Sequence, residues 1–323
     1  MADDIAIARF VPPALQQQGT GRDAHYDVTV ASPELPCGAA WLASALLELG
    51  VPLWRPWGID DTDAWIPLAG NHWRYAFPGS GWSRLVPALV DGRCFRLRTR
   101  PVPRFTHAWP GQLPVTPRVV VVVRDPRDAL YSAWRRARRG GQPVPASFAG
   151  WAADEHRELP MSRAQHTRIW WQAWLTHLAG TPHRVLRFED FKRAPRAALR
   201  AMLAFLGVRT PGRAAARARR AAQHEHFAAA ERTLLDRGVI ATPTLAGGVP
   251  YEWRGHFTEA DHASLGPGWD GLLAALGYEA MPPALRGREA ARIDADATVA
   301  ALLRGSGAGP AQANALRRAL GEL

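Results

Sequence analysis

Arg124 and Ser132 have the residue types and the spacing to bind one anion. Arg124 directly follows five valines at 119–123, and Ser132 lies eight residues further along. A valine run is typical of a parallel strand that is buried on both faces, so we expect Arg124 at the carboxyl end of a strand over 118–123. A helix should begin at 126–128, where proline and aspartate suit a first turn. Both side chains could then grip one phosphate or sulfate near a sheet crevice. A capping cluster with a structural serine is the alternative.

A second candidate anion site lies nearer the start of the sequence. Residues 26–49 predict a short β-branched strand to 31, a Pro/Gly loop and an amphipathic helix from 39. Backbone N–H groups at the beginning of such a helix can bind a phosphate without help from side chains. The groups concerned belong to Gly38, Ala39, Ala40 and Trp41.

Strands and helices alternate along the middle of the chain. A third strand is predicted over 183–188, and it leads through a Glu-Asp pair into a helix over 195–206 that Gly207 stops. An Ala/Arg-rich helix is predicted between 213 and 232. The alternation predicts an α/β fold with a central parallel sheet flanked by helices.

Length and composition predict one large domain with appendages. The chain has 323 residues, 47% of them hydrophobic, which suits a single α/β domain that we place over 1–285. Residues 51–93 hold several tryptophans among prolines and glycines without clean periodicity, so we expect an irregular insertion or lid there. Residues 286–323 predict a small helical tail.

The net charge of +11 comes almost wholly from arginine, because Lys192 is the sole lysine. Arginine suits phosphate and sulfate, which its planar fork binds bidentately. Nucleic acid, an anionic membrane surface or an anionic cofactor could each account for this charge. The alternative is that the arginines lie on solvated faces and bind no partner. Charge alone selects no partner, and no fold motif supports nucleic-acid binding.

Nothing in the sequence predicts a transmembrane segment or a leader. No stretch approaches the roughly 20 apolar residues that span a bilayer, and the first ten residues carry charges. Two cysteines, Cys37 and Cys94, are too few for a disulfide framework. We therefore expect a soluble cytoplasmic protein, with Cys37 as a small apolar loop residue rather than an activated thiolate.

The valine run with Arg124 and Ser132 resembles the 3′-phosphate-binding element of sulfotransferases that use 3′-phosphoadenosine 5′-phosphosulfate (PAPS). Three more segments, at 185–208, 225–227 and 251–278, are similar to further family elements in the same order. The resemblance covers about residues 25–280 and implies the sulfotransferase fold, which is similar to that of P-loop NTPases.

The resemblance also implies a reaction and a set of binding residues. The reaction would be transfer of a sulfuryl group from PAPS to a hydroxyl of a small-molecule or glycan acceptor, with no metal. Arg124 and Ser132 would hold the 3′-phosphate, and the backbone at 38–41 would hold the 5′-phosphate. Trp41 and Phe227 match aromatic residues that contact adenine in the family.

His107 is the candidate base. The family base follows a Lys-Thr pair in the strand before the valine run. Here Phe105-Thr106 corresponds to that pair, with Phe105 in place of the lysine, and His107 follows. Histidine is the usual proton acceptor near neutral pH. A competing alignment places residues 98–100 there and leaves no base. His256 belongs to the last family element, and we expect it to be structural.

The sequence departs from the family in the first phosphate loop. The family has Pro-Lys-Ser-Gly-Thr-Thr-Trp-Leu, whereas residues 35–42 are Leu-Pro-Cys-Gly-Ala-Ala-Trp-Leu. Pro36 stands where a lysine would neutralise the leaving oxygen. We expect Lys192 to lie on a far turn. Either an arginine from the lid or from the Arg-rich helix should therefore replace that lysine, or the enzyme should be slow with the standard donor.

A second departure lies at 246–248, where Ala-Gly-Gly replaces an Arg-Lys-Gly clamp on the 3′-phosphate. Arg232 or Arg237 could compensate. Two alternatives to the PAPS-dependent enzyme stay open: a protein of this fold with another donor or group, and a silent nucleotide-binding relative. A P-loop kinase is disfavoured because the chain has no Gly-Lys-Ser/Thr.

Overall fold

The computed structural model describes most of the chain between residues 26 and 280. The described ranges are 26–51, 53–57, 61–69, 72–75, 98, 100–110, 112, 116–156, 161–236, 248–266 and 268–280, with five single positions between 300 and 317. Those five positions are helical, and the rest of the predicted tail lies outside the described residues.

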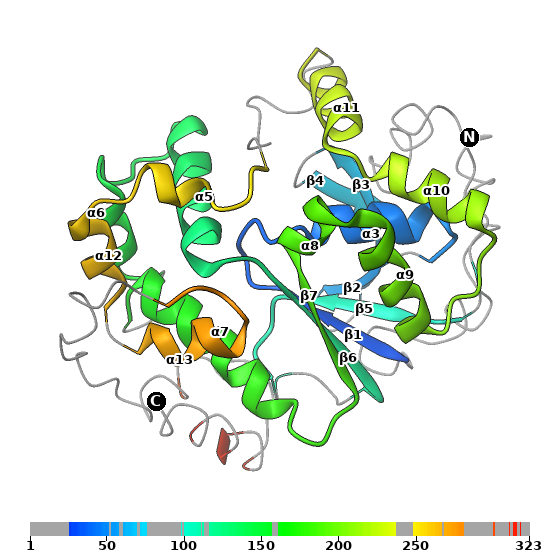
Figure 1. Ribbon diagram of the computed structural model, residues 1–323, viewed down its shortest axis with the longest axis horizontal. Helices are drawn as coiled ribbons and strands as arrows, with labels where there is room; N and C mark the ends of the chain where they lie inside the picture. Colours follow the sequence, from blue (N-terminus) through cyan, green and yellow to red (C-terminus); the bar gives the residue numbers. More distant parts are fainter. Residues whose placement is uncertain are drawn as a thin grey trace.

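A parallel sheet forms the centre of the molecule. Its strands run in the order β4-β3-β2-β5-β1-β6-β7, in which β5, β1, β6 and β7 are mutually parallel neighbours (Figure 1). These four are β1 Val28–Ala31, β5 Pro103–Thr106, β6 Arg118–Val123 and β7 His183–Arg187. All five valines of β6 are buried, as a strand with neighbours on both sides and helices on both faces requires. The predicted parallel α/β fold is confirmed.

The expectation of an irregular segment at 51–93 is wrong for residues 53–57, 61–69 and 72–75. There the chain adds β2 Leu53–Trp57, β3 Asp61–Ala69 and β4 His72–Tyr75 to the sheet, with β3 antiparallel to both neighbours. Tryptophan, threonine and isoleucine favour strands, whereas the prolines hid the pattern. Pro67 lies where the β3–β4 register shifts, and such an irregularity accepts a residue without an N–H donor. Residues 76–97 lie outside the described part.

Two groups of helices flank the sheet (Figure 1). One group contains α5 Pro126–Arg139, α6 Phe148–Ala153, α7 Arg163–His177, α12 Glu259–Leu265 and α13 Trp269–Ala275. The other contains α3 Ala39–Glu48, α8 Phe188–Arg193, α9 Pro195–Leu206, α10 Gly212–Ala221 and α11 His224–Asp236. A short 3-10 helix, η1 Glu252–Gly255, precedes α12.

Helix ends follow the predicted signals in most places. Asp125 caps α5 by accepting from the backbone N–H of Arg127, and Pro126 occupies the first turn. Gly207 ends α9 in the left-handed conformation. The single helix expected over 213–232 is wrong, because the chain breaks at residues 222–223 and forms α10 and α11 instead.

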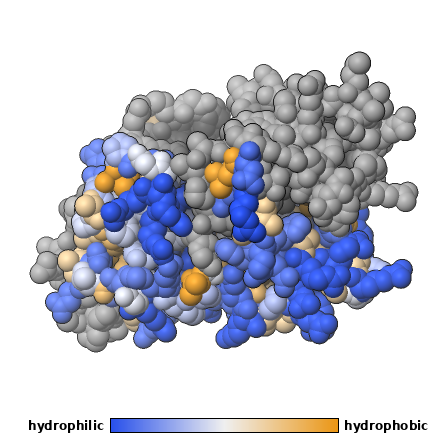
Figure 2. All heavy atoms as spheres, turned by 90° about the horizontal axis from the view of Figure 1, so that it is seen from above, coloured by the Kyte–Doolittle hydropathy of each residue, from blue (hydrophilic) through white to orange (hydrophobic). Residues whose placement is uncertain are grey.

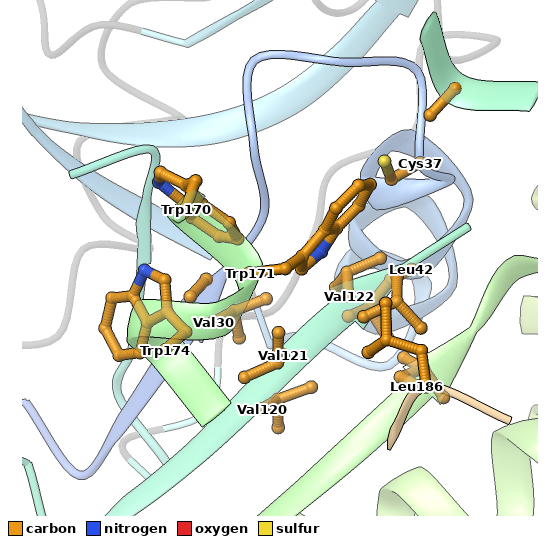
Figure 3. Close-up of a cluster of buried hydrophobic side chains, with 14 of the residues drawn as sticks. Val30, Cys37, Leu42, Val120, Val121, Val122, Trp170, Trp171, Trp174 and Leu186 are labelled. Carbon is orange, nitrogen blue, oxygen red and sulfur yellow. The ribbon is translucent and has the colours of Figure 1, made fainter. Parts of the chain in front are cut away.

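Tryptophans of α7 complete the core. Trp170, Trp171 and Trp174 are at most 4% exposed and gather around the strand valines, with Trp171 directed toward Cys37 (Figure 3). On the face shown in Figure 2 the described surface is mainly hydrophilic, with separate apolar spots. Within the described ranges, Val249 is the one large hydrophobic residue with an exposed side chain, at 52%. None of the described helices combines the length and apolar character needed to cross a membrane.

Candidate functional site

The candidate residues meet at the carboxyl edge of three adjacent parallel strands. His107 follows β5, the loop from Ser32 follows β1, and Arg124 follows β6. Register places Ala31 beside both Thr106 and Val121, so the segments that leave these strands start side by side (Figure 1). Ligands of open α/β sheets bind at this edge.

Gly38 shapes the loop between β1 and α3. Its φ is 90°, and a Cβ atom there would stand 2.8 Å from Cδ2 of Phe188, so a side chain would be strained and would clash. Among the described residues no side chain caps α3. The first N–H groups of α3, from Ala39 onward, are therefore available to an anion, which the helix dipole also favours.

Cys37 is a core residue of this loop. It is 1% exposed, and burial raises the pKa of its thiol well above the ordinary value. Nearby Arg124 opposes that shift without overcoming it. Cys37 is therefore a neutral apolar side chain, as the sequence predicted.

Arg124 ties the loop to the segment at 249–251. Its two terminal nitrogens donate to the carbonyl oxygens of Pro36 at 3.0 Å and Val249 at 3.1 Å, and it pairs with Asp128 at 3.5 Å. The residue is 2% exposed. Its Nε is buried and finds no hydrogen-bond partner in the part of the chain that the structure describes.

Ser132 presents a second polar atom of the same kind. It lies in α5 and is 1% exposed, and within the described ranges its Oγ has no hydrogen-bond partner. A buried polar atom without a partner costs roughly 1–3 kcal/mol. The two side chains that resemblance assigns to the 3′-phosphate therefore each keep an unmet hydrogen bond.

A buried polar network joins the valine-run motif to the other family-like motifs. Asp125 binds Arg127 through both carboxylate oxygens, at 2.9 and 2.8 Å, and Arg127 stacks on Trp253 with 4.0 Å from Cζ to the ring centroid. Glu189 accepts from the backbone N–H of Asp125 at 2.9 Å and from the hydroxyl of Tyr278 at 2.7 Å. These contacts connect segments that lie far apart in the sequence.

Asp128 fixes Arg124 from the first turn of α5. Its carboxylate accepts from the backbone N–H of Trp253 at 3.0 Å and from that of Tyr251. Burial raises the pKa of Asp128 from 3.8 to about 6, although Arg124 and these two N–H groups act in the opposite direction. Asp128 therefore becomes protonated in mildly acidic solution.

His107 is held from two sides. Its Nδ1 lies 2.7 Å from the carbonyl oxygen of Ser32, and its own carbonyl accepts from Nε1 of Trp170 at 3.0 Å. The ring also meets Phe105 edge-on, with 5.0 Å between centroids. A carbonyl can only accept, so a neutral imidazole in this position carries its proton on Nδ1 and its lone pair on Nε2.

The aromatic candidates are placed unequally. Trp41 stacks on Phe191 with 4.1 Å between centroids, and its ring is only half-buried. Phe227 belongs to α11, but its side chain lies outside the described part. His256 is exposed and stacks on Tyr131, with 5.2 Å between centroids.

Lys192 lies at the site, which corrects the expectation of a far turn. Its Nζ is 5.6 Å from the centroid of Phe188, and Cζ of Arg124 is 4.6 Å from the same centroid. Phe188 and Lys192 stand four residues apart in α8, so they share a helix face. The motif at 188–192 suggests a turn rather than this helix, so the four-residue spacing is not evident from the sequence.

Arg136 is a further candidate, which belongs to none of the family-like motifs. It lies four residues after Ser132 on the same face of α5. Burial lowers the pKa of its guanidinium, and Glu34 in the phosphate loop acts in the opposite direction, which indicates that Arg136 lies near this loop. Arg232 lies on α11 and is exposed, whereas Arg237 and residues 246–247 lie outside the described ranges.

Comparison with known proteins identifies the family. The sulfotransferase domain matches residues 91–264, more than half of the chain. The chain therefore belongs to the sulfotransferase domain family, which confirms the resemblance to the PAPS-dependent sulfotransferases and the α/β fold expected from it.

Similar solved structures include mouse sulfotransferase SULT7A1 complexed with PAP, at 16% identity, with 98% of this chain and 95% of that chain covered and a TM-score of 0.45. Retinol dehydratase with androsterone and inactive cofactor PAP has 15% identity, covers 88% and 87%, and has a TM-score of 0.48. Retinol dehydratase with retinol and PAP has 13% identity, covers 87% of each chain, and also has a TM-score of 0.48. No curated protein sequence matches the chain. The family assignment rests on the domain match.

Proposed function

We propose that this protein transfers a sulfuryl group from PAPS to a hydroxyl of a small-molecule or glycan acceptor. One observation carries the proposal: the buried Nε of Arg124 and the buried Oγ of Ser132 lack partners in the described part of the chain, beside a helix that begins without a side-chain cap. The 3′-phosphate of a bisphosphorylated nucleotide would accept from these two side chains, and its 5′-phosphate would accept from the first N–H groups of the helix.

The residues divide the work by position. Arg124 and Ser132 bind the 3′-phosphate, and the N–H groups of residues 38–41 bind the 5′-phosphate. Phe191 covers one face of Trp41, which leaves the other face for adenine, as the resemblance implies. Such sites work by positioning and by charge stabilisation, and the proposed transfer needs no metal.

His107 would take the proton in this reaction. As the acceptor oxygen bonds to sulfur, the bond from sulfur to the bridging phosphate oxygen breaks, and the hydroxyl proton moves to Nε2 of His107. The contact of Nδ1 with the carbonyl oxygen of Ser32 favours the tautomer that can do this, and the hydrogen bond from Trp170 to the carbonyl of His107 holds the backbone in place.

The experiment is a transfer assay with 35S-labelled PAPS and a panel of phenols, alcohols and sugars. We expect labelled product that requires both the donor and the wild-type chain. Labelled product should fall at least about tenfold in Ser132→Ala, since loss of one charge-assisted hydrogen bond has roughly this effect.

Binding of the nucleotide without transfer to any acceptor or to water would instead favour the silent relative. Absence of binding would favour a different donor. These two alternatives arise because proline and cysteine stand at 36 and 37, where the family has lysine and serine.

A further inference from the structure

Two cations contact one aromatic ring that borders the phosphate loop. Arg124 and Lys192 both lie against the ring of Phe188, whose Cδ2 closes on Gly38 at the beginning of α3. Arg124 comes from the end of β6 and Lys192 from α8, so separate elements bring the two charges together. Like charges repel in a partly dry site unless an anion lies between them.

Gly248 makes room for the ammonium of Lys192. The φ of Gly248 is 60°, and a Cβ atom on it would stand 3.2 Å from Nζ of Lys192 and 3.6 Å from Cδ2 of His224. A side chain at 248 would therefore occupy the place that the ammonium approaches. The next residue, Val249, accepts a hydrogen bond from Arg124. One short segment thus contacts both cations.

The charged neighbours of Lys192 leave its positive charge only partly balanced. Partial burial lowers the pKa of the ammonium although the residue as a whole is exposed; Glu225 opposes this shift and Arg124 adds to it. His224 is the other titratable group that faces it, from the beginning of α11. An ammonium held beside an arginine is a site that gains from a bound anion.

We propose that Lys192 binds the 3′-phosphate of the nucleotide and so makes the site prefer 3′-phosphorylated nucleotides. This inference rests on the proposed function and extends it to a residue that neither the motifs nor the family match assigns. Nε of Arg124 and Oγ of Ser132, which lack partners in the described part of the chain, would donate to the same phosphate from the α5 side. Lys192 closes the opposite side, next to the glycine at 248.

Isothermal titration with 3′-phosphoadenosine 5′-phosphate and with adenosine 5′-monophosphate tests the proposal in Lys192→Met. We expect the bisphosphate to bind roughly 10- to 100-fold more weakly, the range of one charge-assisted contact, and the monophosphate to change less than about threefold. Lys192→Arg should keep most of the preference. Equal weakening of both nucleotides, or no weakening of either, would overturn the proposal.

Arg193→Met is the matched control. It removes a positive charge one residue away, from a side chain that is 82% exposed and paired with Asp190 at the surface. Its affinities should equal those of the wild type. If the wild type itself fails to prefer the bisphosphate over the monophosphate, the proposed function fails rather than the assignment of Lys192.

A second measurement needs no substitution. Because Lys192 is the sole lysine, labelling the chain with 13C-lysine gives one side-chain Cε signal. We expect the titration midpoint of this signal to rise when the bisphosphate binds and to stay near its free value with the monophosphate. A midpoint unchanged by the bisphosphate would contradict the contact.

Discussion

Nδ1 of His107 lies 2.7 Å from the carbonyl oxygen of Ser32, across the boundary between β5 and β1. The contact joins the candidate base to the first residue of the phosphate loop. Movement of the loop would therefore move the imidazole, and the sheet register that pairs Ala31 with Thr106 keeps both in place. The orientation of the base is built into the parallel sheet.

Removal of this imidazole should slow sulfuryl transfer and leave nucleotide binding unchanged. His107→Ala should lower single-turnover transfer by roughly 10²–10⁴-fold, the usual contribution of a positioned base, while titration shows unchanged nucleotide affinity. His256→Ala is the control, because that ring stacks on Tyr131 instead. Full turnover in His107→Ala would assign the proton to another group.

Ser132→Ala should separate stability from affinity. The hydroxyl has no partner within the described ranges, so its removal should not lower the free energy of unfolding and can raise it by about 1 kcal/mol. Affinity for the bisphosphate should nevertheless fall roughly 10- to 100-fold. Urea unfolding and titration calorimetry measure the two effects.

Ser44→Ala provides the matched comparison for Ser132. Oγ of Ser44 donates to the carbonyl of Ala221 at 3.3 Å, so this variant should lose about 1 kcal/mol of stability and keep its affinity. A Ser132→Ala protein that is destabilised and still binds normally would make Ser132 structural.

Asp128 should make stability depend on pH in the mildly acidic range. A carboxyl whose pKa rises on folding stabilises the folded chain fully below its ordinary pKa of 3.8, and this contribution is lost as the pH rises through about 6. A rise from 3.8 to about 6 corresponds to ~3 kcal/mol. Urea unfolding between pH 4 and 7 should show this loss in the wild type.

Asp128→Asn should remove that part of the pH dependence, because an amide does not titrate. Asp190→Asn, at an exposed carboxylate paired with Arg193, should leave the profile of the wild type intact. Identical profiles for Asp128→Asn and the wild type would show that Asp128 stays ionised throughout.

Arg136 is the arginine that we expect to replace the missing loop lysine. It lies near Cys37 on the same helix face as Ser132, so Arg136→Ala should slow single-turnover transfer by roughly 10²–10³-fold, as for other donors that stabilise developing charge. Arg138→Ala, at an exposed position of the same helix, is the control. A normal rate in Arg136→Ala would exclude the replacement.

Restoring the lysine tests the same point from the other side. Pro36→Lys keeps the backbone carbonyl that Arg124 binds. Alone it should gain less than about tenfold in rate, and in the Arg136→Ala background it should recover part of the loss. A larger gain in the otherwise native chain would mean that the native loop has no substitute.

The sequence predicted the sheet centre and the order of its main elements. The valine run, the proline at 126 and the glycine at 207 are local signals, and they were enough to predict β6, the beginning of α5 and the end of α9. The strands over 53–75 escaped prediction because prolines broke their pattern, and pairing with distant residues supplied the missing information.

The candidate site divides in the same way. Arg124 and His107 could be placed from the strands they follow, because parallel strands end at one edge. Lys192 could not, since its position depends on α8 turning back over the loop and on the close approach of Gly248. Gly248 lies 56 positions after Lys192, and the phosphate loop lies still further away in the sequence, so neither contact produces a pattern in local residue spacing.

We propose that the site is built for an adenosine nucleotide with a 3′-phosphate. Titration calorimetry of the wild-type chain with 3′-phosphoadenosine 5′-phosphate and with ATP tests it without knowledge of the acceptor. We predict that the bisphosphate binds at least about tenfold more tightly, because Arg124 and Ser132 supply contacts that ATP cannot use. Equal affinity for the two nucleotides, or tighter binding of ATP, would contradict it.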